Sequence, residues 1–224
     1  ADLNYNNLAM QADMIGDMKY WVEKFDIDGF RQDMALLIPM EFWTEANKQL
    51  RSIKNDLFLL AESELPEHVN SGSFHAIYSW SLHYILNEIA VGRQSIKDID
   101  HWYATVKSRL HQGSYLLFTS NHDENSWNGT GYERLGPSRQ VFDVLAFTLV
   151  GMPLMYTSQE GGEQYPDGKA HRLRFFDKDT TNWNGYKYQD FYSKLLHAHR
   201  DNPALWNGEF GGEFKKIKTS SDDI

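Results

Sequence analysis

Short runs rich in apolar residues alternate along the chain with longer segments in which apolar residues recur every three or four positions. The five runs are FDIDGFRQD, DLFLLAES, SFHAIYSW, SYLLFTSNHD and MPLMYTSQE. Each run contains a short apolar stretch and is bounded by turn residues, which is typical of strands that are buried on both faces of a parallel sheet. The pattern therefore predicts an α/β fold in which five parallel strands alternate with helices.

The periodic segments predict the helices and the faces that they bury. They span residues 8–25, 39–53, 82–110, 139–150 and 188–200, with a break at Gly92 and with Pro39 in a first helical turn. Five such strands can belong to an open doubly wound sheet or to part of a closed barrel, and periodicity does not decide between the two. The residues expected to face the core are Met14, Met18, Trp21, Val22, Phe25, Phe42, Trp43, Ala46, Leu50, Ile53, Phe191, Leu195 and Leu196.

Composition limits the classes of partner. The chain has 224 residues, of which 41% are hydrophobic, enough for one large core. A net charge of −9 argues against a nucleic-acid binder and against an anionic membrane surface as partner. The absence of cysteine excludes disulfides and thiolate metal sites, and no metal site is predicted. A neutral small-molecule or carbohydrate ligand suits such a protein, and composition predicts no particular cell compartment.

Three carboxylates follow three of the predicted strands. Asp33 ends DGFRQD, Glu62 lies in LLAESE, and Asp123 lies in FTSNHDEN. The carboxyl ends of strands are where α/β barrels place their chemistry, and clustered acids there are typical of glycosidic bond cleavage. The sequence therefore predicts a glycoside-cleaving site at this edge of the sheet.

The neighbours of the acids suggest different tasks for them. Arg31 and Asp33 share a face of their strand, and an adjacent arginine stabilises the carboxylate form that a nucleophile needs; a structural ion pair that closes the strand is an equal alternative. The apolar approach to Glu62 is expected to raise its pKa, as a general acid requires, and Glu64 is a weaker rival. His122 and Asp123 are adjacent, so the chain must bend there if both are to act.

The ordered set ADLNYNN, DGFRQD, LLAESE, FTSNHDENS and GMPLMYTSQE resembles the conserved segments of the α-amylase family of retaining glycoside hydrolases. The resemblance runs from the second residue to about residue 210. It implies a (β/α)8 barrel in which Asp33 is the nucleophile, Glu62 the general acid/base and Asp123 the transition-state stabiliser. It also implies that Arg31 orients Asp33 and that His122 contacts the sugar. The substrate implied is an α-glucan such as starch or a maltodextrin.

The resemblance implies that only the last five β/α units of the TIM-type barrel lie in this chain. We expect residues 1–205 to be the carboxyl-terminal portion of the barrel and 206–224 its end and the start of a β domain. Five strands of eight leave two open edges, so we expect the missing part, or oligomerisation, to be needed. Where many members carry a Lys-His pair after the nucleophile, Met-Ala-Leu-Leu stands here. No cofactor is therefore predicted, and calcium stays open for the full-length enzyme.

Three other readings of the function stay open. A transglycosylase of the same family differs only in its acceptor, a non-catalytic relative would be expected to lose acids that are present here, and the chain alone can be inactive. Trp127, Tyr78 and Trp80 follow strand ends and are candidates for stacking on sugars, with packing as the equal alternative.

Overall fold

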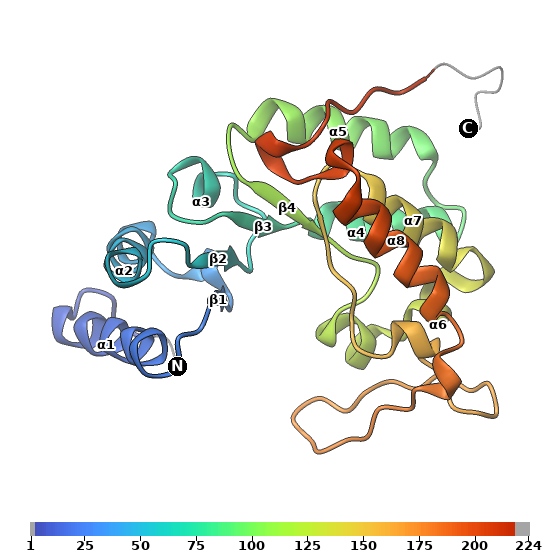
Figure 1. Ribbon diagram of the computed structural model, residues 1–224, viewed down its shortest axis with the longest axis horizontal. Coiled ribbons are helices and arrows are strands. Elements are labelled where there is room, and N and C mark those ends of the chain that lie inside the picture. The colour runs from blue at the N-terminus through green and yellow to red at the C-terminus, as the bar shows by residue number, and fades with distance from the viewer. Residues whose placement is uncertain (1–2, 218–224) are drawn as a thin grey trace. The chain divides into compact units, whose positions relative to one another are not determined.

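The computed structural model describes residues 3–217. The first two residues of ADLNYNN and the tail from residue 218 lie outside the described residues. The strands are β1 (Gly29–Gln32), β2 (Phe58–Ala61), β3 (Ala76–Tyr78), β4 (Ser114–Leu117) and β5 (Met152–Pro153). The α-helices are α1 (Leu8–Phe25), α2 (Met40–Ile53), α3 (Glu67–Asn70), α4 (Trp80–Ala90), α5 (Ile96–Arg109), α6 (Gly131–Leu135), α7 (Arg139–Thr148) and α8 (Gln189–Asp201) (Figure 1).

The strand order decides between the two architectures that periodicity left open. The sheet runs β1-β2-β3-β4-β5, and β1 with β2, β2 with β3, and β4 with β5 pair in parallel. Each strand thus lies beside its neighbour in the sequence. A doubly wound sheet reverses its strand order at a switch point, whereas a (β/α) barrel does not. The chain therefore forms part of a (β/α)8 barrel, as the sequence predicts.

The chain divides into two compact units, which are described separately. Among the described residues, the first unit holds residues up to 78 together with 107–115, and the second holds 79–106 and the residues from 116 onward. In the first unit, α1 packs beside α2 (Figure 1). The apolar face of α2 is buried as predicted, through Phe42, Trp43, Ala46 and Leu50. In the second unit, α7 packs against α8.

Some predicted inward positions are wrong. Trp21 and Phe25 of α1 are exposed. The buried positions of this helix are Val22, which was predicted, and Ile15, which was not. Ile53, at the last residue of α2, is also exposed.

The buried face of α8 is also different from the prediction. Leu196 is exposed and Tyr192 is buried in its place. Tyr192 is buried because its hydroxyl forms two hydrogen bonds with α7: it donates to Asp143 and accepts from Arg139. A pattern of apolar residues alone does not reveal such a contact. Within residues 3–217, no helix combines the length and the apolar character needed to cross a membrane.

Alanine substitutions at two glycines of the first unit are expected to change the free energy of unfolding in opposite directions. A Cβ at Gly29 in β1 would lie 1.9 Å from the Phe58 carbonyl oxygen, whereas a Cβ at Gly16 in α1 would meet nothing within 4 Å. We expect Gly29→Ala to destabilise the fold by about 1–3 kcal/mol or more through overpacking. Gly16→Ala should stabilise it by about 0.5–1 kcal/mol, because glycine is unfavourable inside a helix. Urea unfolding of both variants measures the two effects, and a neutral Gly29→Ala would contradict the close packing of β1 on β2.

Candidate active site

One guanidinium in the first unit contacts two of the three predicted acids. Arg31 Nη1 lies 2.5 Å from Asp33 Oδ1, and Arg31 Nη2 lies 2.7 Å from Glu62 Oε1. The two carboxyl groups differ in environment, because the Asp33 side chain is 75% exposed and that of Glu62 only 8%. The structure therefore brings Arg31, Asp33 and Glu62 together and gives the two acids different solvation.

The register of two strands produces this cluster. β1 and β2 pair with Gln32 opposite Ala61, and the Glu62 amide donates to the Gln32 carbonyl oxygen at 2.9 Å. Asp33 and Glu62 therefore both directly follow the ends of neighbouring parallel strands. Met34 then adopts a left-handed conformation (φ 45°), and its amide donates to Glu62 Oε2 at 2.7 Å. A non-glycine residue in this region is strained, and strain of this kind concentrates at functional sites.

Burial raises the pKa of Glu62 above its ordinary value, and the neighbouring negative charge of Asp33 adds to the rise. The Met34 amide and the Arg31 charge lower the pKa but do not cancel these effects. The direction is the one that the sequence predicts for Glu62. A carboxyl group with a raised pKa keeps its proton to higher pH, as a general acid must.

Arg31 is held in turn by Tyr78, a contact that the sequence analysis missed. Arg31 Nε donates to the Tyr78 hydroxyl at 3.1 Å, and the guanidinium carbon lies 5.6 Å from the centre of the ring. Burial alone would lower the pKa of Arg31, but the bond to Tyr78 and the two carboxylates raise it overall. The Tyr78 ring is buried at the end of β3, so of the two predicted roles it has the packing one.

The charge of Asp33 makes a testable contribution to the pKa of Glu62. We expect Asp33→Asn to lower the pKa of Glu62, because a neutral amide no longer disfavours ionisation of its neighbour. A carbon-13 NMR titration of labelled glutamate carboxyls measures the shift. Glu88, whose pKa is lowered by its bond to Arg93, is the internal control, and its pKa should be the same in both proteins. An unchanged or higher pKa of Glu62 would contradict the assignment.

The second unit places His122 and Asp123 on a bend. β4 ends at Leu117, and both residues lie in helical conformation directly before a π-helix, Glu124–Asn128. His122 Nε2 lies 3.4 Å from Asp123 Oδ2, and both side chains are partly exposed. The bend that the sequence required for these neighbours is thus present. π-helical turns are rare and are often found at functional sites.

A buried polar network supports this bend. Glu124 Oε2 lies 3.0 Å from His83 Nε2, and the Glu124 amide donates to Asn121 Oδ1 at 2.8 Å. Burial alone would raise the pKa of Glu124, but the bond to His83 and the nearby charge of Arg134 lower it overall. Glu124 is therefore a structural anion that fixes the segment carrying His122 and Asp123.

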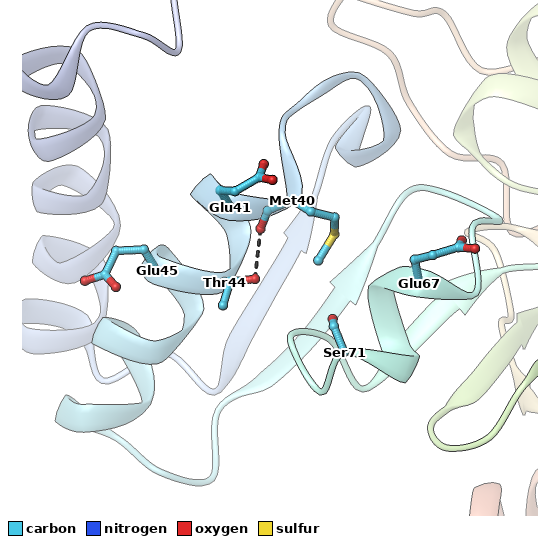
Figure 2. A pocket seen from close by; sticks show the side chains of 6 residues that line it. All are labelled: Met40, Glu41, Thr44, Glu45, Glu67 and Ser71. Atoms are coloured by element: carbon cyan, nitrogen blue, oxygen red, sulfur yellow. Dashed lines mark hydrogen bonds between the residues drawn. The ribbon is translucent and has the colours of Figure 1, made fainter.

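Other features of the structure do not add to the site. An open depression of about 420 Å³ in the first unit is lined by residues of α2, of α3 and of the turn that follows α3 (Figure 2), but neither Asp33 nor Glu62 lines it. Its lining residues are Met40, Glu41, Thr44, Glu45, Glu67 and Ser71. Over residues 3–217, no three histidine, aspartate or glutamate side chains gather as a metal site would require.

Comparison with known proteins identifies the family. Residues 1–170 match the model of the alpha amylase catalytic domain. The chain belongs to the alpha-amylase family. It is 26% identical over 215 residues to alpha-amylase MalA of Haloarcula japonica, covering 92% of this chain and 29% of that protein. It is 27% identical over 203 residues to maltogenic alpha-amylase of Bacillus acidopullulyticus, covering 84% of this chain and 33% of the relative. The chain thus spans about a third of these relatives.

Solved structures agree with this membership. The maltogenic alpha-amylase AmyB of Thermotoga neapolitana is similar with a TM-score of 0.69 and 25% identity, over 90% of this chain and 47% of that one. The alpha-amylase of Geobacillus thermoleovorans, solved in complex with acarbose, is similar with a TM-score of 0.71 at 24% identity, over 91% and 47% of the two chains. The second likeness shows the fold alone.

Proposed function

We propose that this chain carries the catalytic acids of a retaining glycoside hydrolase that cleaves α-glucans or maltooligosaccharides. The observation that supports this most is the Arg31 guanidinium between an exposed Asp33 and a buried Glu62. A retaining enzyme needs one carboxylate that attacks and one carboxyl group that donates a proton. The exposed acid beside an arginine suits the first task, and the buried acid of raised pKa suits the second.

The proposed reaction has two steps. Asp33 attacks the anomeric carbon while Glu62 gives its proton to the departing glycosidic oxygen, and a glycosyl ester forms on Asp33. Glu62, now a carboxylate, takes a proton from water, whose oxygen replaces Asp33 at the anomeric carbon. Asp123 would bind sugar hydroxyls more tightly as the ring flattens, and His122 would contact the same sugar. Arg31 keeps both acids oriented through the two steps.

Water is the acceptor in this proposal, and a second sugar is the acceptor in the rival one. Relatives named maltogenic alpha-amylase and cyclomaltodextrinase suggest hydrolysis of short α-glucans. The products formed from maltooligosaccharides distinguish the two. Net release of reducing ends supports the hydrolase, whereas longer oligosaccharides without new reducing ends would assign the chain to the transglycosylases.

We also propose that the sheet is completed by further strands, in the same protein or in another copy. In the strand order, β1 and β5 each have one neighbour, and a closed barrel leaves no free edge. The solved relatives are about twice as long as the part that matches. Sedimentation of the 224-residue chain tests this: self-association or poor solubility supports completion, and a compact, soluble monomer contradicts it.

A fluorinated glucosyl inactivator tests the proposed reaction itself. Such a compound forms the glycosyl ester but resolves it slowly, so the label stays on the nucleophile. Mass spectrometry of peptides should find the label on Asp33 and no label in Asp33→Asn. A label on another residue, or none on a protein that cleaves maltooligosaccharides, would show the assignment to be wrong.

A further inference from the structure

An aromatic cluster in the second unit has no place in the proposed reaction. It consists of Trp127, Phe175 and Phe176, which we call the aromatic platform. Trp127 is 60% exposed and Phe176 is 94% exposed, although both are large apolar side chains. The Trp127 and Phe175 rings lie 5.2 Å apart at 40°, and the Phe175 and Phe176 rings lie 4.4 Å apart at 83°. The exposed rings are thus contiguous rather than scattered.

The platform is continuous with the candidate site. The His122 ring stacks on Phe175 with centroids 5.7 Å apart, and His122 Nε2 lies 3.4 Å from Asp123 Oδ2. A chain of direct contacts therefore leads from Asp123 through His122 and Phe175 to Trp127. A ligand held on the platform would lie next to the pair that the proposed function assigns to the reacting sugar.

The platform is also built on a fixed frame. Ser126 Oγ donates to the Leu173 carbonyl oxygen at 2.6 Å, and the Leu173 amide donates to Asn125 Oδ1 at 2.7 Å. These two bonds tie the π-helix that carries Trp127 to the loop that carries both phenylalanines. Phe176 has a left-handed backbone (φ 61°), which is strained for an aromatic residue. Strained backbone of this kind concentrates at functional sites, so the exposed Phe176 ring is a reasonable position to test for a binding role.

We propose that the aromatic platform is a subsite that binds a glucosyl unit of an α-linked glucan beside the reacting sugar. Its position beside the reacting sugar rests on the proposed function, whereas the kind of ligand follows from the aromatic side chains themselves. A pyranose presents an apolar C–H face that packs on aromatic rings, and its hydroxyl edge can remain in water. The platform rings are inclined to one another, so their surface is not flat. A curved, α-linked chain suits it better than the flat ribbon of a β-1,4-linked glucan.

Binding measurements on the soluble protein, with the completing strands proposed above present, test the proposal without requiring turnover. Titration calorimetry with maltoheptaose is carried out in the Asp33→Asn background, so that no substrate is consumed. We expect Trp127→Ala and Phe176→Ala each to weaken binding about tenfold, in line with the usual strength of aromatic contacts. Phe210→Ala is the matched control, because Phe210 is 73% exposed and lies outside the platform. Cellohexaose, the β-linked probe, should bind far more weakly than maltoheptaose.

The outcomes separate this proposal from the proposed function. Unchanged maltoheptaose affinity in both platform variants, with near-ultraviolet circular dichroism like that of the parent, would overturn the subsite even if Asp33 takes the covalent label. If the platform variants weaken maltoheptaose binding but the inactivator does not label Asp33, the subsite is supported and the proposed reaction is contradicted. If the variants change the sedimentation coefficient but not the sugar affinity, the platform is a protein interface and the proposal is wrong.

Discussion

Glu62→Gln should slow the hydrolysis of maltooligosaccharides by the active enzyme on the order of 10²–10⁴-fold, the usual contribution of a general acid. Glutamine keeps the size of the side chain, and its single oxygen can accept from the Met34 amide or from Arg31 but not from both. Near-ultraviolet circular dichroism like that of the parent therefore has to accompany the rate loss, so that the loss is assigned to proton donation rather than to folding. Measured as kcat/KM, which reports the first step, the defect should be much smaller for a glucosyl substrate whose leaving group departs without protonation. Kinetics with both substrates measures this difference.

Glu64→Gln is the matched control, because Glu64 is the rival acid two residues on. It should change the rate little with either substrate. Equal losses with both substrates in Glu62→Gln would contradict the role of general acid, and a larger loss in Glu64→Gln would move that role to Glu64.

The raised pKa of Glu62 also sets the sign of the pH dependence. The first step needs this group protonated, so activity should fall as pH rises through its pKa. Because burial raises that pKa, the fall should come at higher pH than for an ordinary glutamate.

The sequence predicts the part of the site that depends on strand ends. Asp33 and Glu62 each directly follow a run with strand character, and the parallel pairing of β1 with β2 brings them together. The contact between Arg31 and Asp33 follows from their spacing of two along the chain. These contacts were predictable because the period of a strand and the order of the strands determine them.

The contacts that were missed depend on single tertiary interactions. The Tyr78 hydroxyl accepts from Arg31 across 47 residues of sequence, and no local pattern predicts this pairing. The π-helix after Asp123 has only five residues, which is too short for a periodic pattern of apolar residues to reveal it. β5 has only two residues and includes Pro153, which lacks the amide needed to continue a ladder. The apolar run predicted a longer strand because hydropathy does not report hydrogen-bonding capacity.

The largest effect on stability is expected at Asp143, a buried acid on α7. Thr119 Oγ1 donates to Asp143 Oδ1 at 2.6 Å, and the Tyr192 hydroxyl donates to Oδ2 at 2.7 Å. Arg139 Nε lies 3.5 Å from the same carboxylate. Asp143 thus joins α7 and α8 to the segment that follows β4, three residues before His122.

We expect Asp143→Ala to destabilise the second unit by about 3–5 kcal/mol, because it leaves the Arg139 charge buried with one carboxylate fewer. Asp143→Asn keeps the size of the side chain and should cost less. Asp201→Ala is the control, since its exposed pair with Arg200 is fully solvated and should contribute little. Denaturant unfolding followed by circular dichroism measures all three. If Asp143→Ala were as stable as Asp201→Ala, the contacts of Asp143 with Thr119, Tyr192 and Arg139 would not stabilise the second unit. They could then not be what holds the segment with His122 and Asp123 in place.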